Sequence, residues 1–358
     1  MSKDDQNIYR YVFVCGLPRS GTSVLGRNIG RLENCTDLRE TGVFEDEGQF
    51  LQDVYPIDGD LGGAGRFGFD PRAHRTESSN LLTPANVAKL HRSWEPYWDK
   101  SKTIRVEKTP GNLLMTRFLQ AAFPNCYFIV IRRHPVPVGM ASQKWKVNVA
   151  PLYKLFEHWL HCHGLFEADK KYLKHVYELR YEDYIEDAEK YHKEIAAFIG
   201  TSVPPQPKED KRRVVAQWRN PTGLSVPENA MEEVTGAHNK KYFRRWALLL
   251  TKSTLKGYYR YIASKYESRF ATYGYSLIEG FGLDREVIRR GGKVWNAIGA
   301  SYFRAADVIA FLQRTASRSR WRVKQLMKAA LPEFILSRIR QARRRAYPSK
   351  EMAHIASR

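Results

Sequence analysis

A glycine-containing segment near the start of the sequence has the residue types and the spacing of a phosphate-binding loop. Two glycines five positions apart are followed directly by two hydroxyl residues, in the pattern GxxxxG with Thr and Ser. Glycines let the backbone wrap around an anion, and successive N–H groups and a helix N-terminus then point at it. The residues predicted to hold the anion are Gly16, Pro18, Arg19, Ser20, Gly21, Thr22 and Ser23.

The same loop lacks the lysine that nucleotide triphosphatases carry. Thr22 occupies the position whose lysine normally reaches the β- and γ-phosphates, which argues against hydrolysis of ATP or GTP. The apolar segment 126–131 ends in Arg132 and Arg133, where such enzymes have the aspartate that helps to hold Mg²⁺. The cation lies in the loop itself, as Arg19, and no metal is expected. A small-molecule kinase and a purely structural glycine turn are the alternatives that these residues leave open.

Strands and helices alternate around this loop, which predicts an α/β fold with a P-loop-type central parallel β-sheet flanked by helices. Apolar strands are predicted at 9–15, 103–106, 126–131 and 176–180, and helices at 24–32, 83–98, 112–123, 150–174, 187–199 and 239–270. Segments 59–69 and 201–233 are predicted to be loops, and the second is a candidate substrate lid. Ligands bind at the carboxyl edge of the strands in open α/β sheets, so the loop and Arg133 are expected to meet there.

Five segments together resemble the superfamily of sulfotransferases that use 3′-phosphoadenosine-5′-phosphosulfate (PAPS), including its bacterial branch and the tyrosylprotein and carbohydrate sulfotransferases. The segments are PRSGTS (18–23), EKTP (107–110), FPNCYFIVIRRHP (123–135), LRYED (179–183) and YGY (273–275). The first resembles the family's 5′-phosphosulfate loop, and the third resembles its 3′-phosphate strand and turn. The resemblance covers roughly residues 9–277. It implies a sulfotransferase fold and transfer of a sulfuryl group from PAPS, without a metal, to an acceptor hydroxyl.

The resemblance also assigns cofactor binding to residues outside the loop. Arg133 is expected to bind the 3′-phosphate through its planar fork of donors, and Tyr181 to contact the adenine. The family usually has a serine eight residues after that arginine, where this chain has Ala141. Ser142 is therefore expected to make the contact through a local shift. A solvated basic turn at Arg133 and a plain core tyrosine at Tyr181 are the alternatives.

Two cations are candidates for stabilising the leaving group. Sulfuryl transfer resembles phosphoryl transfer in its needs, because negative charge builds on the bridging oxygen as the bisphosphate departs. Arg19 and Lys108 would stabilise that charge more in the transition state than in the ground state. Lys108 follows a predicted strand and lies close to Pro110, so its backbone is expected to be held firmly. A surface lysine in a salt bridge is the alternative.

A carboxylate must take the proton of the acceptor hydroxyl, and three glutamates are candidates. In the tyrosylprotein enzymes a glutamate lies 21 residues after the loop arginine, and an ungapped count gives Glu40. Glu47 and Glu45 are favoured, because they are predicted to open a helix at 49–55 whose N-terminus would fix the side chain and stabilise its charge. One alternative is that all three glutamates only stabilise the first turn of the predicted helix and take no part in catalysis. The other is that the base lies on the loop 59–77.

A cluster of histidines is expected to be structural. His158, His161, Cys162 and His163 stand in the sequence HWLHCH, but one helix cannot aim all four at one metal ion. Core and surface histidines are therefore predicted. The four cysteines of the chain show no pairing pattern and are expected to be reduced and buried.

Positive charge is concentrated at the C-terminal end. Of the formal net charge of +21, residues 281–358 carry +13, with 18 Lys and Arg against 5 Asp and Glu. These residues are predicted to form a basic helical C-terminal extension to a sulfotransferase domain at 1–280. Segments 293–314 and 321–345 mix apolar residues with arginines as interfacial helices do, which predicts contact with a membrane surface or an anionic partner. Helices packed on the enzyme with a solvated basic face are the alternative.

The composition of the sequence restricts the expected cellular location of the protein and the classes of molecule that it is expected to bind. Residues 1–10 are polar and lack the apolar core of a signal peptide, and no run of about 18 uncharged apolar residues occurs. We therefore expect a cytoplasmic protein, with peripheral contact at the inner membrane surface. The stacking motifs of RNA-binding modules are absent, so nucleic acid is not an expected partner, although a non-enzymatic basic protein that binds membranes or nucleic acids stays an alternative. The expected acceptor is a glycan or glycolipid, with tyrosine and small alcohols open.

Overall fold

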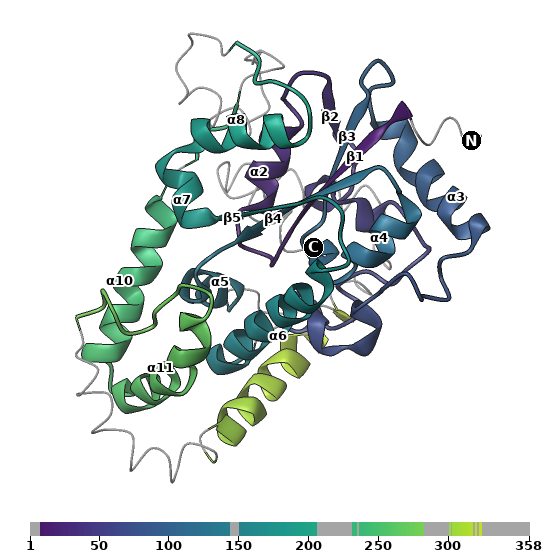
Figure 1. Cartoon of the computed structure of the whole chain (residues 1–358). Coiled ribbons are helices and arrows are strands. Elements are labelled where there is room, and N and C mark those ends of the chain that lie inside the picture. The colour runs from purple at the N-terminus through teal and green to yellow at the C-terminus, as the bar shows by residue number, and fades with distance from the viewer. Residues whose placement is uncertain are drawn as a thin grey trace, which may run out of the picture.

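A sheet of five parallel strands forms the centre of the molecule, in the order β2-β3-β1-β4-β5 (Figure 1). The computed structural model describes residues 8–143, 150–205, 231–234, 236–282, 301, 303–317, 319–320 and 322–323. The strands are β1 (Arg10–Gly16), β2 (Cys35–Asp37), β3 (Ile104–Lys108), β4 (Cys126–Arg132) and β5 (Val176–Arg180). The predicted α/β fold is confirmed. Strand β2 was not predicted, because three residues carry too little periodicity.

Both faces of the sheet are covered because successive side chains of a strand point to opposite faces. Along β1, Val12 and Val14 belong to a core shared with α2 and α8, while Phe13 and Cys15 belong to a second core shared with α3, α4 and α6. Figure 1 shows these two groups of helices on opposite sides of the sheet. The described helices are α2 (Thr22–Ile29), α3 (Pro84–Trp94), α4 (Thr116–Ala122), α5 (Pro135–Ser142), α6 (Leu152–Lys170), α7 (Tyr181–Glu186), α8 (Ala188–Phe198), α10 (Ala237–Thr251) and α11 (Lys256–Ala271).

The register of the strands brings the predicted site residues to one edge. The pairs nearest that edge are Val14 with Lys108, Gly16 with Ile131, and Arg132 with Arg180. The loop after β1 and the residues that follow β3, β4 and β5 therefore meet at the carboxyl edge, where ligands bind in this class of sheet.

Local hydrogen bonds decide where the predicted helices begin and break. Helix α3 starts as predicted, since the Thr83 hydroxyl accepts from the Asn86 N–H at 3.2 Å. The helix predicted at 112–123 is a 3₁₀ turn, Pro110–Leu114, followed by α4, because Asn112 donates its side-chain amide to Glu107. The helix predicted at 239–270 is divided into α10 and α11 near Ser253, whose hydroxyl accepts from the backbone N–H of Leu255 at 3.1 Å.

The helix predicted at 49–55 is wrong. Two short 3₁₀ turns, Phe44–Asp46 and Gly48–Phe50, occupy this part of the chain instead. The Gln52 side-chain oxygen accepts from the backbone N–H groups of Val54 and Tyr55, at 2.7 and 2.9 Å, which replaces helical hydrogen bonds. Pro56 further disfavours a helical conformation of the residue before it. Glu45 and Glu47 therefore do not lie at the start of a helix.

Part of the predicted C-terminal extension packs on α6. Residues 303–317 are helical, and the Phe303 ring stacks on that of Tyr153 in α6 with 3.8 Å between centroids. Most of the candidate lid at 201–233, and the rest of the segments 293–314 and 321–345, lie outside the described residues. Within the residues that the structure describes, a helix with the length and hydrophobicity needed to cross a bilayer is not found.

Candidate active site

The loop between β1 and α2 is held in a conformation that few residues tolerate. A Cβ atom on Gly16 would lie 2.6 Å from the backbone oxygen of Ile131, and one on Gly21 would lie 2.6 Å from the Tyr181 ring. Arg19 and Gly21 both adopt positive φ angles, of 73° and 97°, which is a strained conformation for the arginine. The Ser20 hydroxyl is buried and has no hydrogen-bond partner among the described residues. A buried unpaired hydroxyl inside a loop of this shape fits a loop built around an anion.

Arg133 connects this loop to Tyr181. Its Nη1 donates to the Arg19 carbonyl at 2.6 Å, and its guanidinium lies 4.1 Å from the centroid of the Tyr181 ring. Nε and Nη2 donate to the side-chain oxygen of Asn239 at 2.9 and 2.5 Å. Burial lowers the pKa of the Arg133 guanidinium, and the nearby Tyr181 and Glu182 oppose that shift. The structure thus brings together three of the residues that the sequence associated with an adenosine bisphosphate.

Ser142 lies apart from that group. Its hydroxyl donates to the Val138 carbonyl within α5 at 2.8 Å. The residue lines a small void together with Leu17 and Pro18 of the loop. A contact with the 3′-phosphate would require the hydroxyl to turn away from its own helix.

Lys108 is anchored between the two favoured glutamates. Its side chain is 9% exposed, and its Nζ donates to the backbone oxygen of Glu45 at 3.0 Å and to Glu47 Oε1 at 3.1 Å. The other oxygen of Glu47 accepts from the Gln49 amide at 2.6 Å. Burial raises the pKa of the Glu47 carboxyl, although Lys108 and Gln49 lower it. Both oxygens of Glu47 are therefore occupied by partners within the protein.

Glu45 faces an open cavity of about 290 Å³ beside the loop. The cavity is lined by Ser23, Gly26, Arg27, Asp37, Leu38, Arg39, Glu40, Glu45, Asp46, Val106 and Lys108. Partial burial raises the pKa of the Glu45 carboxyl, but Lys108 and a hydrogen bond with Ser23 lower it, so the pKa lies below its usual value. Glu40 also lines the cavity and has a positive φ of 52°, whereas Glu47 does not line it. Arg19 lies exposed on the loop, and Glu45 and Glu47 are among the charges that act on it.

A family comparison identifies the chain. Residues 11–205 match the model of the sulfotransferase family, and this match spans more than half of the chain. The chain belongs to the sulfotransferase family. It is accordingly a sulfotransferase, an enzyme that transfers sulfuryl groups. The sequence-based assignment to that superfamily is confirmed. No curated protein matches the sequence.

Solved structures similar to this sulfotransferase come from bacteria and from mouse. The sulfotransferase domain of the Synechococcus PCC 7002 olefin synthase is 15% identical and has a TM-score of 0.39, covering 65% of this chain and 87% of its own. A sulfotransferase from Alicyclobacillus acidocaldarius is 15% identical with a TM-score of 0.38, covering 58% and 90%. A mouse sulfotransferase in complex with PAP is 16% identical with a TM-score of 0.33, covering 69% and 86%.

Two residues that support the sulfotransferase site were not predicted. Asn239 in α10 accepts from Arg133 and donates to Glu182 at 3.0 Å. Glu182 also accepts from the backbone N–H of His134 at 3.2 Å and from the Tyr275 hydroxyl at 3.2 Å. Glu182 belongs to the RYED segment, so the resemblance could have suggested it, whereas no local pattern marks Asn239, which lies 106 positions from Arg133.

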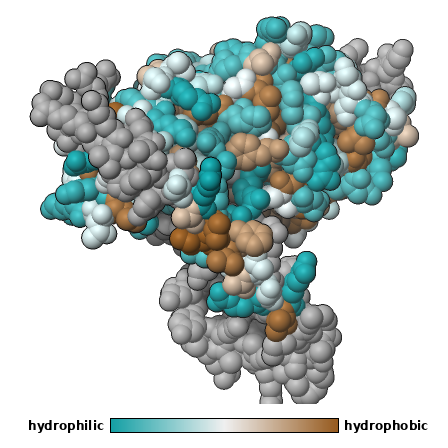
Figure 2. Space-filling model, turned by 90° about the horizontal axis from the view of Figure 1, so that it is seen from below, coloured by the Kyte–Doolittle hydropathy of each residue, from teal (hydrophilic) through white to brown (hydrophobic). Residues whose placement is uncertain are grey.

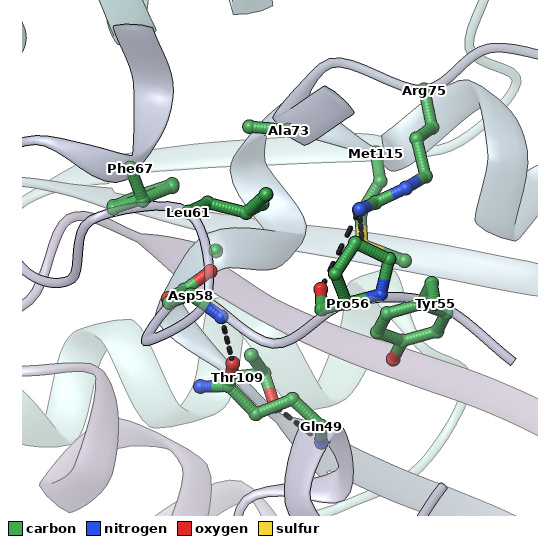
Figure 3. Close-up of a pocket in the computed structure, with 11 residues that line it drawn as sticks. Gln49, Tyr55, Pro56, Asp58, Leu61, Phe67, Ala73, Arg75, Thr109 and Met115 are labelled. Atoms are coloured by element: carbon green, nitrogen blue, oxygen red, sulfur yellow. Dashed lines mark hydrogen bonds between the residues drawn. The ribbon is translucent and has the colours of Figure 1, made fainter. Parts of the chain in front are cut away.

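Figure 3 shows a polar cluster that includes Gln49, Asp58 and Arg75. Gln49 donates to Glu47, and its side-chain oxygen accepts from the backbone N–H of Asp58 at 2.9 Å. Asp58, Arg75, Tyr55 and Thr109 are among the residues that line a small void of about 10 Å³, which has room for one water molecule. Burial raises the pKa of Asp58 to about 7, the charge of Glu47 adds to the shift, and Arg75 opposes it.

This shift predicts that Asp58 makes the protein less stable as the pH rises. The pKa of Asp58 in the folded protein, about 7, lies above the unfolded value near 3.9, so the folded state binds more protons between these limits. The free energy of unfolding should therefore fall as the pH rises from 5 to 7, and Asp58→Asn should remove this fall. Urea unfolding measures this at both pH values. Between pH 5 and pH 7, the free energy of unfolding of the variant should rise by about 1 kcal/mol or more relative to that of the wild type. Asp60→Asn, an exposed residue on the same loop, is the control; equal behaviour of the two variants would refute the assignment.

The histidines of α6 are packing residues in the described structure. His158 Nε2 lies 3.1 Å from the backbone nitrogen of Gly68, which donates to it, and 3.4 Å from Cys162 Sγ. Burial lowers the pKa of His158 to about 3, and burial also lowers that of His163. Among the described residues, no group of three or more His, Cys, Asp or Glu side chains is placed to hold a metal ion.

Proposed function

We propose that this sulfotransferase takes its sulfuryl group from PAPS and transfers it to a hydroxyl of a glycan or glycolipid. The observation that carries the proposal is the arrangement at the carboxyl edge of the sheet. An anion-binding loop is joined by Arg133 to the face of Tyr181, and on its other side Ser23 shares a cavity with Lys108 and Glu45. One side suits an adenosine bisphosphate, and the other suits a reacting hydroxyl.

The donor side is proposed to hold PAPS as follows. The N–H groups of residues 16–23 and the side chains of the loop bind the 5′-phosphosulfate. Arg133 binds the 3′-phosphate, with Ser142 as a second contact, and Tyr181 lies against the adenine. PAPS supplies the activated sulfuryl group, and the residues of this chain orient it and neutralise its charge. The fit is supported by the buried unpaired hydroxyl of Ser20 and by the buried guanidinium of Arg133, which connects the loop to Tyr181.

The acceptor side is proposed to carry the chemistry. Lys108 and Arg19 stabilise the charge that develops on the bridging oxygen. Glu45 accepts the proton of the acceptor hydroxyl, since it faces the cavity beside Ser23. Glu47 holds Lys108 in place and is a positioning residue, because both of its oxygens are already bonded. Glu40 lines the same cavity without a bond to the loop in the described contacts, so it is the second candidate for the base.

The lining of the cavity supports a polyhydroxylated acceptor. Both carboxylates and guanidinium groups line it, and such groups hydrogen-bond to sugar hydroxyls. Its volume is at the lower end of the range for small-molecule sites, which suits one or two sugar rings. The test is a transfer assay with labelled PAPS against soluble oligosaccharides, glycolipids, tyrosine peptides and simple alcohols. Label in the sugar classes is expected, and label confined to tyrosine peptides or simple alcohols would replace the proposed acceptor.

Arg133→Ala should weaken binding of adenosine 3′,5′-bisphosphate by about 1.5–3 kcal/mol, the usual contribution of a hydrogen bond to a charged group. Calorimetric titration of the bisphosphate measures this directly. Arg132→Ala is the matched control, since Arg132 precedes it but pairs with Glu167 and Glu178 instead. Unchanged affinity in Arg133→Ala, or an equal loss in both variants, would remove Arg133 from the donor site.

We also propose that the enzyme acts in the cytoplasm and meets the inner membrane surface through the basic extension. The support for this part is the charge of +13 carried by residues 281–358. A lipid-linked acceptor would be presented at that surface.

A further inference from the structure

The C-terminal helix docks on the enzyme through one face only. Phe303 is 8% exposed and Ala310 is 3% exposed, and both belong to the buried side of residues 303–317. The ring of Phe303 lies parallel to that of Tyr153, with an angle of 2° between the planes. Asp307 accepts a hydrogen bond from the Tyr153 hydroxyl. The orientation of this helix on the enzyme is therefore fixed.

The opposite face of the same helix is apolar and exposed. Val308, Ile309, Phe311 and Leu312 are 57%, 56%, 58% and 59% exposed, and we refer to these four residues as the outer patch. A helix turns about 100° per residue, so Leu312 projects half a turn away from Phe303. Figure 2, which views the molecule from the side where Figure 1 places this helix, shows apolar side chains gathered in the middle of the face. An exposed apolar patch of this kind marks an interaction site.

Positive charge lies at both ends of the outer patch. Arg304 precedes it and Arg320 and Arg322 follow it, and all three are exposed. In the described part of the helix, Asp307 is the one acidic residue, and it faces the enzyme. Large apolar side chains bordered by arginines match the boundary between acyl chains and anionic headgroups in a bilayer. A protein partner would need a groove that is both apolar and acidic, so the lipid surface is the simpler match.

We infer that the outer patch inserts into the headgroup region of an anionic bilayer while Arg304, Arg320 and Arg322 bind lipid phosphates. This inference rests on the proposed contact with the membrane and assigns that contact to the helix at 303–317. It also specifies which side of the enzyme faces the membrane. It uses no part of the proposed chemistry, so each can fail without the other.

Vesicle sedimentation with the full chain tests the inference. Wild-type protein should bind vesicles of phosphatidylglycerol and phosphatidylcholine at least tenfold more tightly than vesicles of phosphatidylcholine alone. The double variant Phe311→Asp, Leu312→Asp should lose at least tenfold in binding to the anionic vesicles. Leu248→Asp is the matched control, because Leu248 is a 45% exposed leucine on α10 outside the outer patch, and it should bind as wild type does. Arg320→Gln with Arg322→Gln should lose several-fold on anionic vesicles only.

The same variants distinguish a membrane contact from a dimer in which a second copy of the chain covers the outer patch. Circular dichroism and thermal melts establish that each variant is folded before binding is compared. If the wild type binds neither kind of vesicle, the inference is overturned. Sedimentation velocity then shows whether a second copy covers the outer patch, as a dimer that Phe311→Asp dissociates. Equal vesicle binding by the patch variant and the Leu248→Asp control would also overturn it.

Discussion

Lys108→Ala is expected to lower kcat by about 10²–10³-fold and to leave the affinity for adenosine 3′,5′-bisphosphate within about twofold, the loss typical of one removed donor in an oxyanion site. The Lys108 ammonium donates two hydrogen bonds that hold it in place, one to the backbone oxygen of Glu45 and one to the Glu47 carboxylate. Its charge is therefore in place before the bridging oxygen becomes negative. A cation that acts mainly on the transition state changes kcat and kcat/KM equally. Steady-state kinetics with PAPS and an accepted hydroxyl, together with calorimetry, provide both quantities.

Loss of Lys108 also leaves the Glu47 carboxylate buried without its cation, which costs stability. A thermal melt must therefore accompany the kinetics, and Lys108→Met, which keeps the apolar stem, separates charge from packing. Lys89→Ala is the control, since Lys89 is exposed and pairs with Asp53 on the surface. A pure rise in KM would show that Lys108 acts in substrate binding. A folded Lys108→Met with a normal kcat and KM would show that Lys108 is a structural lysine.

Glu45→Gln is expected to reduce kcat by about 10²–10⁴-fold, the usual contribution of a general base. The variant keeps the size of the side chain and should still bind the bisphosphate normally. The pH dependence offers an independent test, because the pKa of Glu45 is lowered below its ordinary value of 4.5 while that of Glu47 is raised above it. A base is active when deprotonated, so activity should be lost only as the pH falls through the depressed pKa of Glu45. Activity that already falls at a pH above that ordinary value would point to Glu47, whose pKa is raised.

The three glutamates must be changed one at a time for this result to be decisive. Glu47→Gln should lower kcat less than Glu45→Gln does. Because Lys108 donates a hydrogen bond to Glu47, the effects of Glu47→Gln and Lys108→Ala on kcat should not be additive in the double variant. Glu40→Gln should keep most of the rate. If Glu40→Gln is the inactive variant, the base is Glu40. If all three keep near-normal rates, the assignment fails and the base lies elsewhere, with the loop 59–77 as the next segment to test.

The scaffold of the donor site could be predicted because its signals are local. Strand β1, the loop and α2 follow one another without a break, so the apolar run and the glycine spacing sufficed to predict them. Strand β4 is buried almost throughout and ends at Arg132, directly before Arg133, so its coverage on both faces followed from its composition. Proximity of Arg133 to the loop then followed from the general rule for parallel sheets.

The acceptor side could not be predicted in the same way, because long-range contacts shape it. Segment 49–55 was predicted to be helical, but Gly48 just before it donates its N–H to Glu107, 59 residues away, and the Gln52 side chain accepts from the backbone N–H of Val54. Only the folded chain shows that Glu47 is bonded to Lys108 and Gln49 while Glu45 faces the cavity. The preference for Glu47 and Glu45 over Glu40 rested on a helix that does not form.

The most direct test of the account is calorimetric titration of adenosine 3′,5′-bisphosphate in EDTA, compared with Mg²⁺ and with ATP. The loop has Thr22 in place of the nucleotide-triphosphatase lysine and carries its own cation in Arg19, so the bisphosphate should bind with equal affinity in EDTA and in Mg²⁺. It should also bind more tightly than ATP, because we propose that Arg133 and Tyr181, whose guanidinium and ring centroid lie 4.1 Å apart, form a site for an adenosine with a 3′-phosphate. An absolute requirement for Mg²⁺, or tighter binding of ATP than of the bisphosphate, would contradict PAPS as the donor.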